Sequence, residues 1–195
     1  KLSEIFPEFN EEPIASASIA QVHLAELDDG REVIVKVVRP DLKKTISQDI
    51  GLMYFLADFA ERYLAVGKLM KPRAIVAEFE KTILDELDML REAANASQLK
   101  RNLESSDLVH IPEVFWEYVR PNVLVMEKVS GLNIGDLDSL REQQIDLKQL
   151  AEDGISLFFT QVFRDHFFHA DLHPGNLFVI PGENGERAKY AVVDF

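Results

Sequence analysis

The chain has 195 residues, of which 47% are hydrophobic, which is enough for one sizeable domain or a small two-lobed one with a packed core. The net charge of −13 argues against nucleic acid as a main partner, because phosphate backbones attract clustered Lys and Arg. The one modest basic cluster, Lys68, Lys71 and Arg73, is typical of a solvated turn. The absence of cysteine excludes a disulfide scaffold and a cysteine-based nucleophile or metal site.

In chain order the sequence predicts a hairpin over residues 14–39, a helix from about Asp41 to Tyr63, a helix from Pro72 past Leu99, strands over 111–119 and 122–129, a helix from about Leu147 to Phe163, and strands over 176–180 and 189–194. Asp28-Asp29-Gly30 is a strong hairpin signal. Asp41 and Pro72 suit helix starts, and apolar residues follow both at helical spacing. Strands and helices mixed without regular βαβ alternation predict an α+β fold.

Two features bear on what lies outside this sequence. It has no initiator Met and ends on the apolar, strand-like Val193-Asp194-Phe195, so we expect it to be a piece of a longer protein. No apolar run has the length of a membrane span, and the first residues do not have the pattern of a signal peptide.

The strongest local motif is the loop His169-Ala170-Asp171-Leu172-His173-Pro174-Gly175-Asn176. An Asp followed five positions later by an Asn, and then by a short apolar strand, is the layout of a phosphotransferase catalytic loop. Asp171 would orient or deprotonate the attacking hydroxyl, and Asn176 would help to hold a metal ion. A metal site formed by the histidines of this region, His166, His169 and His173, is a competing interpretation. We favour it less, because the Asp–Asn spacing explains the loop without it.

Asp194 and Lys36 are the next candidates. Asp194-Phe195 follows an apolar strand, 18 positions after Asn176, as does the Asp of Asp-Phe-Gly that binds magnesium in kinases. Lys36 lies in the apolar run Val33-Ile34-Val35-Lys36, where a charged side chain is costly unless its charge is used. A lysine in this setting is typical of the residue that grips the α- and β-phosphates of ATP.

Such a lysine needs a carboxylate to hold it, and the predicted second helix supplies several. We choose Glu86, within Asp85-Glu86-Leu87-Asp88, as the first candidate for an ion pair with Lys36. Glu92 is the second candidate.

An alanine-rich loop and a hinge complete the predicted nucleotide site. Residues 15–22 (ASASIAQV) occupy the register of the loop Gly-x-Gly-x-x-Gly-x-Val, with Ala in place of each Gly. Alanine restricts the backbone more than glycine, so we expect this loop to hold the γ-phosphate less well and to favour ADP. The residues expected to contact nucleotide there are Ala15, Ser16, Ala17, Ser18 and Val22. On the strand over residues 123–129, Met126 would be the gatekeeper, and the backbone of Glu127 and Val129 would face adenine.

These segments together resemble the UbiB-type atypical kinases, a kinase-like family linked to ubiquinone (coenzyme Q) biosynthesis. The segments that carry the resemblance are ASASIAQVH at 15–23, VIVKVVRP at 33–40, DELDMLREAAN at 85–95 and FFHADLHPGN at 167–176. The resemblance implies a two-lobed protein-kinase-like fold, with an N-lobe over residues 1–129 that has extra helices and a partial C-lobe over 130–195. It also implies binding of ATP or ADP with Mg²⁺, and ATPase activity.

The resemblance assigns roles residue by residue. Ala17 falls in the nucleotide loop, Lys36 at the phosphate-gripping lysine and Glu86 at its partner, while Asp171 falls at the catalytic Asp and Asn176 and Asp194 at the metal ligands. It also implies work on lipid or quinone precursors with other quinone-biosynthesis proteins, at the cytoplasmic side of a bacterial inner membrane. The family's Lys-x-Gly-Gln element is absent from this sequence, and we expect membrane attachment to lie in parts that the sequence does not include.

Three alternatives differ in what the nucleotide is for. The first is a non-catalytic scaffold that changes shape with ADP or ATP. The second is a small-molecule kinase of the aminoglycoside or choline type, whose catalytic loop is similar, although the alanine loop and Arg91-Glu92-Ala93-Ala94-Asn95 favour the UbiB type. An ordinary protein kinase is least favoured, because Ala170 replaces the Arg of His-Arg-Asp.

Overall fold

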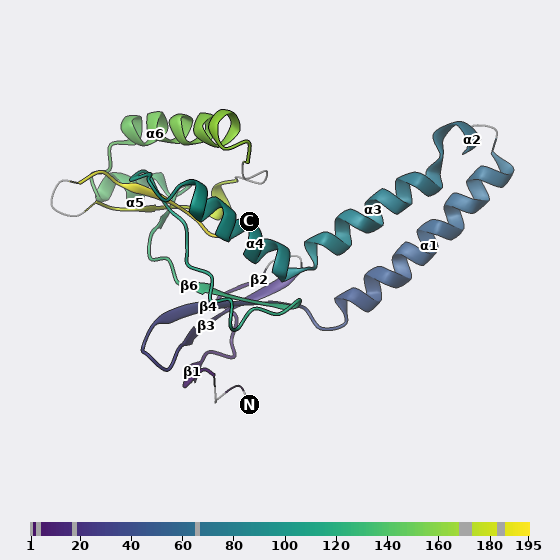
Figure 1. Cartoon of the computed structure of the whole chain (residues 1–195), viewed down its shortest axis with the longest axis horizontal. Helices are drawn as coiled ribbons and strands as arrows, with labels where there is room; N and C mark the ends of the chain where they lie inside the picture. Colours follow the sequence, from purple (N-terminus) through teal and green to yellow (C-terminus); the bar gives the residue numbers. More distant parts are fainter. Residues whose placement is uncertain (1, 3–4, 17–18, 65–66, 168–172, 183–185) are drawn as a thin grey trace.

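The computed structural model describes residues 2, 5–16, 19–64, 67–167, 173–182 and 186–195. Two β-sheets and the helices packed against them form the body of the molecule, and a pair of long helices projects from it (Figure 1). Ala17, Ser18 and Asp171, three of the residues predicted to act in the site, lie outside the described residues.

The first sheet contains the predicted N-terminal hairpin. Its strands are β1 (Glu8–Phe9), β2 (Ala15–Ser16), β3 (Ala20–Glu26), β4 (Glu32–Val38) and β6 (Val123–Glu127), in the order β1-β3-β4-β6 with β2 beside β3, all antiparallel. Gly30 takes a φ of 82° in the β3–β4 turn, which confirms the hairpin signal. Lys36 lies opposite Val22 on one side and Leu124 on the other, so it stands in the middle of the sheet.

Successive side chains of β4 alternate between the two faces of the sheet, and this decides which of them point toward the candidate site described below. Val33 and Val35 point into one apolar cluster, with Phe6, Phe115 and Val125. Because successive side chains of a strand point to opposite faces, Ile34 and Lys36 point to the other face.

The second sheet has the order β5-β9-β8-β7. Its strands are β5 (Val109–His110), β7 (Leu132–Asn133), β8 (Leu177–Ile180) and β9 (Lys189–Val192). β8 and β9 form the predicted antiparallel hairpin, while β5 pairs with β9 in parallel. Helices α5 (Leu137–Glu142) and α6 (Leu147–Phe159) contribute Leu140, Leu150 and Leu157 to the core of this sheet. β5 therefore joins the second sheet although it precedes residue 129, where we expect the boundary between lobes.

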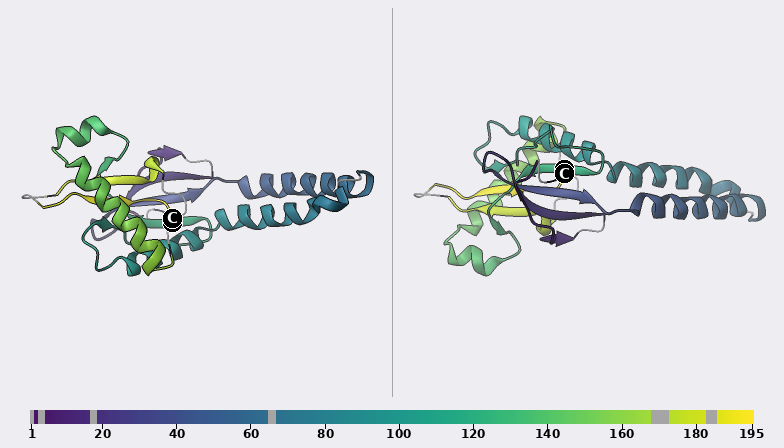
Figure 2. Two further views of the ribbon diagram at one scale, coloured as in Figure 1. Left: turned by 90° about the horizontal axis from the view of Figure 1, so that it is seen from above. Right: turned by 90° about the horizontal axis from the view of Figure 1, so that it is seen from below.

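Two long helices form an arm that extends away from both sheets (Figures 1 and 2). We call residues 42–86 the helical arm; it comprises α1 (Leu42–Tyr63), the short α2 (Gly67–Met70) and α3 (Pro72–Glu86). Ile50 and Ala57 of α1 and Val76 of α3 are buried, and the Tyr54 hydroxyl donates a hydrogen bond to Glu80 over 2.7 Å. The predicted bounds of α1 are confirmed to within one residue, but the expected cap is not formed: Asp41 takes a left-handed φ of 63° and its side chain makes no capping hydrogen bond.

The predicted helix from Pro72 past Leu99 is wrong, because the chain breaks it in two. α3 ends at Glu86, and α4 (Met89–Asn102) begins after Asp88, whose side chain accepts a hydrogen bond from Leu90 N–H. Asp88 is extended (φ −102°, ψ 97°), as an N-cap residue is. The apolar periodicity continues across this break, so it does not reveal the break. The cap sets a new direction for α4, which carries Glu92.

Two further predicted elements differ in detail. Residues 111–119 form no regular strand; Val114 makes one isolated bridge to Met126, and the nearby Pro112 has no N–H to offer a ladder. The helix predicted to reach Phe163 is α-helical to Phe159 and π-helical over Thr160–Arg164.

Candidate functional site

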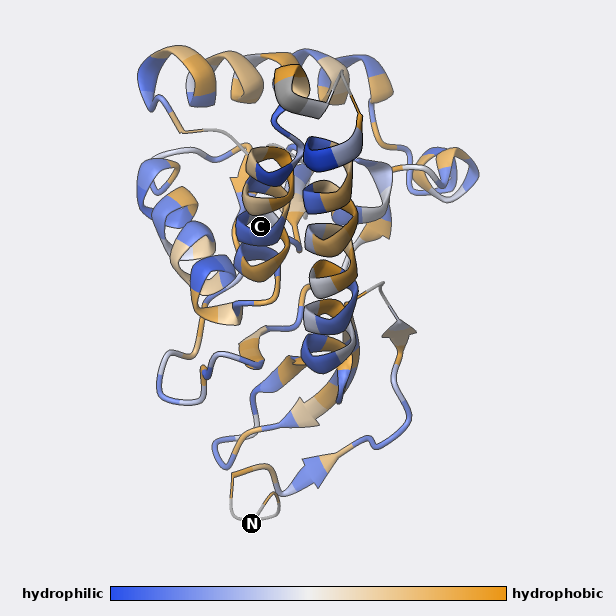
Figure 3. Ribbon diagram, turned by 90° about the vertical axis from the view of Figure 1, so that its right-hand side faces the viewer, coloured by the Kyte–Doolittle hydropathy of each residue, from blue (hydrophilic) through white to orange (hydrophobic). Residues whose placement is uncertain are grey.

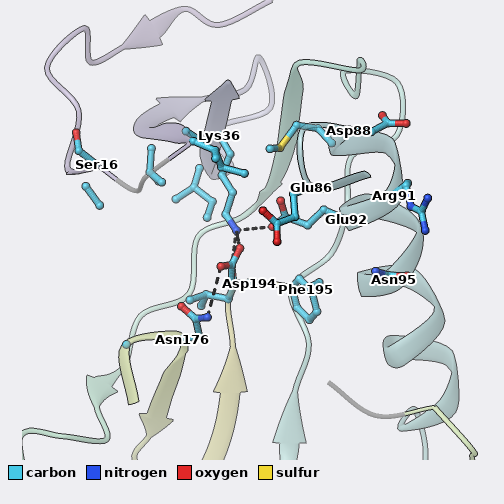
Figure 4. A pocket seen from close by; sticks show the side chains of 18 of the residues that line it. Ser16, Lys36, Glu86, Asp88, Arg91, Glu92, Asn95, Asn176, Asp194 and Phe195 are labelled. Carbon is cyan, nitrogen blue, oxygen red and sulfur yellow. Dashed lines mark hydrogen bonds and ion pairs between the residues drawn. The ribbon is translucent and has the colours of Figure 1, made fainter. Parts of the chain in front are cut away.

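Lys36 is the centre of the site, and two carboxylates share its ammonium group. Its Nζ lies 2.5 Å from Glu92 Oε1 and 2.7 Å from Asp194 Oδ1, and it donates a third hydrogen bond to Val193 O over 2.8 Å (Figure 4). Lys36 is only 7% exposed. Three hydrogen-bond acceptors therefore match the three donors of a buried ammonium group. The acceptors come from α4 and from the segment after β9, so this one side chain joins the two sheets.

The predicted ion pair between Lys36 and Glu86 is wrong, and Glu92 is the partner. Met89, Ala93 and Ala96 of α4 are buried, and Glu92 lies on a neighbouring position of the same helix face. Glu86 is the last residue of α3, is exposed, and precedes the break at Asp88. Within the described part of the chain it makes no ion pair with Lys36, although it lines the same cavity. Spacing along a continuous helix could not reveal this, because the helix is not continuous.

One cation between two carboxylates shifts the titration of the cluster. Burial raises the pKa of Glu92 to about 7, although the charge of Lys36 opposes the rise and that of Asp194 adds to it. Burial acts to lower the pKa of Lys36, but the negative charges of Glu92 and Asp194 outweigh it and raise that pKa. The ammonium group therefore keeps its charge, and Glu92 is the group whose ionisation is disfavoured.

Asn176 and Asp194, the two predicted metal ligands, lie next to each other. Asn176 Nδ2 donates to Asp194 Oδ2 over 3.4 Å, and the Val193 N–H donates to Asn176 O over 3.1 Å. Asn176 is 8% exposed, whereas the Asp194 side chain is half exposed. A carboxylate beside an amide oxygen is the donor set that magnesium prefers, so the residues present fit that ion. His173, from the competing histidine interpretation, accepts a hydrogen bond from Gly175 N–H through Nδ1 and shapes the local turn.

A cavity of about 1000 Å³ opens beside Lys36. The predicted nucleotide-binding residues that line it are Ala15, Ser16, Val22, Lys36 and Val129, together with the metal-ligand candidates Asn176 and Asp194. Ala15 and Ser16 belong to β2 and pair with Val22 and Gln21 of β3, so the described part of the alanine-rich loop is strand apart from Ile19. A cavity of this size, whose lining combines apolar residues with charged ones of both signs, is typical of a ligand site.

Of the three predicted hinge residues, Val129 lines this cavity, whereas Met126 and Glu127 are not among its lining residues. Met126 is fully buried and packs with Met89 and Leu124, so its side chain lies within the core. The Glu127 side chain hydrogen-bonds to His110 Nε2 and accepts from Glu113 N–H, and the bond to His110 is the main cause that lowers the pKa of Glu127. These contacts fix the strand end that leads to Val129.

The sequence reasoning missed the cavity wall where α3 meets α4. Asp85, Asp88, Arg91 and Asn95 line this wall, and Arg91 Nη1 forms an ion pair with Asp85 Oδ1 over 2.5 Å. The sequence shows the acidic run at residues 85–88, but we considered it only as a source of ion-pair partners for Lys36 and not as part of a cavity wall. Phe195 packs against the core of each sheet and lines the cavity next to Asp194.

Comparison with known proteins identifies the family. The ABC1 atypical kinase-like domain matches residues 1–195. The chain belongs to this family. The chain is similar to proteins named "Probable protein kinase UbiB" from Pseudomonas fluorescens SBW25 (58% identity over 92% of this chain) and Marinobacter nauticus (52% over all of it). It spans about a third of their length, 34% and 35%.

Solved structures of similar proteins establish the fold of this ABC1-family chain as kinase-like and α+β. The complex of Rv3197 with erythromycin from Mycobacterium tuberculosis matches all of the chain and 47% of its own length, with a TM-score of 0.75 and 30% identity. The Rio2 kinase complex with ADP, Mg²⁺ and phosphoaspartate from Chaetomium thermophilum matches all of the chain and 49% of its own length, with a TM-score of 0.58. At 14% identity, the second comparison supports the fold alone.

The geometry predicts a specific coupling between Lys36 and Glu92. In a double-mutant cycle of Lys36→Met and Glu92→Gln, we expect a coupling energy of about 1–3 kcal/mol in the free energy of unfolding, because either single change leaves a buried charged group short of a partner. The matched cycle of Lys36→Met with Glu86→Gln should give a coupling near zero. Denaturant titration of the four variants in each cycle measures both. A larger coupling to Glu86 than to Glu92 would contradict the arrangement.

Proposed function

We propose that the cavity binds a magnesium nucleotide, ATP or ADP, and that the chain is the nucleotide-binding part of a kinase-like ATPase or phosphotransferase. The observation that supports this best is the buried Lys36 ammonium group held between Glu92 and Asp194 at the cavity wall. A fixed cation in the wall of a cavity suits a phosphate chain, whose charge would be stabilised more strongly there than in water. The family membership and the nucleotide named in the Rio2 complex agree with this proposal.

In this proposal Lys36 contacts the phosphates and Glu92 keeps its ammonium group in place. Glu92 is well suited because it projects from a helix whose neighbouring residues are buried, so its position is fixed by packing. Asp194 is suited to a second role, because half of its side chain is open to the cavity.

Asn176 and Asp194 would hold the magnesium ion, which supplies positive charge that offsets the charge of the phosphates. Asn176 is fixed by its place at the end of the 3-10 turn Pro174–Asn176, directly before β8, and by the hydrogen bond from Val193 N–H. The base would lie against Val22 and Val129, with the buried Met126 behind them. Ala15 and Ser16 would cover the nucleotide, and Ala17 and Ser18 continue that loop in sequence.

The reaction itself rests on Asp171, which we propose orients the hydroxyl or water that attacks the terminal phosphate. The names of the similar bacterial proteins agree with a role in ubiquinone biosynthesis. For that role we propose lipid or quinone precursors and other proteins of the pathway as partners. We propose that the whole protein carries out this role at the cytoplasmic side of a bacterial inner membrane.

Magnesium dependence tests the assignment of Asp194. In the full-length protein, Asp194→Asn should weaken nucleotide binding in the presence of magnesium by about tenfold or more, because one of its anionic ligands is lost. Binding without magnesium should change much less. Calorimetric titration of ADP with magnesium or with a chelator measures both, and Asp138→Asn, a highly exposed position on α5, is the matched control. Equal losses in the two conditions would count against a metal at Asp194.

Turnover separates an enzyme from a nucleotide-binding scaffold. Asp171→Asn in the full-length protein should lower the rate of ATP hydrolysis by roughly two orders of magnitude, the scale of a lost general base, with little change in nucleotide affinity. A steady-state assay of phosphate release, with and without magnesium, measures this rate. Unchanged hydrolysis would favour a scaffold that uses the same cavity without catalysis.

A further inference from the structure

The chain crosses between the two sheets twice in close succession. The first sheet lies at the N-terminal end of the body, and the second lies under α6 (Figures 1 and 3). Residues 111–122, the first crossing, lead from β5 in the second sheet to β6 in the first, and residues 128–131, the second crossing, lead from β6 to β7. Because residues of both sheets line the cavity, the way these crossings are held affects its shape.

Glu127, at the end of β6, ties the two crossings together. Its Oε1 lies 2.9 Å from His110 Nε2, and its Oε2 accepts a hydrogen bond from the Glu113 N–H over 3.0 Å. The Glu127 N–H in turn donates to Glu113 O over 2.8 Å. The bond to His110 lowers the pKa of Glu127, which keeps the carboxylate charged. One side chain at the start of the second crossing therefore holds the end of β5 and the start of the first crossing.

His110 belongs to the strand pair that leads to the metal-ligand candidates. β5 pairs with β9 in parallel, and His110 lies opposite Ala191. Asp194 follows shortly after β9, and its carboxylate holds Lys36. The contact between His110 and Glu127 thus joins the strands beside Asp194 to the end of β6.

A neighbouring ion pair holds the end of β6 to the first sheet. Lys128 Nζ lies 2.9 Å from each carboxylate oxygen of Glu32, the first residue of β4. Glu127 is therefore held to the second sheet and Lys128 to the first. Val129 comes next and lines the cavity, so its place relative to both sheets is set by these two contacts.

We propose that His110 is a positioning residue for nucleotide binding, which acts through Glu127 to keep two parts of the cavity wall at a fixed separation. One part is Val129, and the other is the pair Asn176 and Asp194. This inference rests on the proposed function, in which the base lies against the first part and the metal ion at the second. A nucleotide must contact both parts, so it binds more tightly when their separation is set before it arrives.

The role requires a hydrogen-bond donor at position 110. An ionised carboxylate only accepts hydrogen bonds, so an apolar side chain there would leave Glu127 Oε1 without this partner. His110 is not among the residues that line the cavity, so it acts through Glu127 and not on the ligand. The side chains of His110 and Glu127 are 36% and 37% exposed, so we expect the moderate effect of an ion pair that is partly open to water.

Calorimetric titration of ADP with magnesium into the full-length protein tests the inference. His110→Leu should bind about threefold to fivefold more weakly than wild type, the scale of a partly exposed ion pair. His110→Gln should bind nearly as tightly as wild type, because the amide nitrogen of Gln is as many bonds from the backbone as Nε2 of His. The matched control is Arg141→Gln, which removes an exposed ion pair within α5 and should leave the affinity unchanged.

Hydrogen–deuterium exchange of the same proteins without nucleotide measures the contact itself. In His110→Leu, peptides that contain the Glu113 or Glu127 N–H should exchange faster than in wild type, and in His110→Gln they should not. Unchanged exchange in His110→Leu would overturn the inference.

The titration separates a failure of this inference from a failure of the proposed function. Equal affinity of wild type and His110→Leu, or equal weakening in His110→Leu and His110→Gln, would overturn the inference and leave the proposed function standing. If wild type itself bound no nucleotide, the proposed function would be wrong, and the inference would be overturned with it.

Discussion

The rest of the structure depends on one buried ammonium group. An apolar strand at the centre of a sheet is a costly place for a charge, and Lys36 is stable there only because three acceptors reach it at once. Those acceptors come from α4 and from the chain after β9, and both segments line the cavity. The two sheets must therefore be placed relative to each other accurately enough to satisfy one side chain. The site of the proposed chemistry is also where the two halves of the body are joined.

The direction of α4 is the second constraint, and it links the site to the arm. α4 begins at a cap formed by Asp88, directly after the end of α3, so the helix that presents Glu92 follows the helix that forms the arm. Met89, Ala93 and Ala96 hold α4 against the core, and Arg91 ties it to Asp85 at the end of α3. The helical arm is thus an addition to the kinase-like body. It is joined to that body through α4, the helix whose Glu92 holds Lys36.

Short-range patterns predicted the parts of the fold and site that depend on local sequence. The β3–β4 hairpin followed from Asp28-Asp29-Gly30, and the adjacency of Asn176 and Asp194 followed from a short hairpin between them. The partner of Lys36 could not be predicted in the same way. Glu86 and Glu92 are both acidic residues of one segment with apolar residues at helical spacing, so the spacing does not distinguish them. The helix break at Asp88 and the burial of α4 make Glu92 the partner of Lys36. The expected lobe boundary and the role of Asp171 stay predictions.

Covalent labelling of Lys36 by an acyl-phosphate derivative of ATP tests the central claim most directly. Such a reagent transfers its acyl group to a lysine amine that lies beside the bound phosphates, and mass spectrometry of the digested full-length protein identifies the lysine. We expect labelling at Lys36, with loss of that labelling when excess ATP or ADP is added with magnesium. Labelling of other lysines alone, or labelling of Lys36 that excess nucleotide does not reduce, would contradict the account.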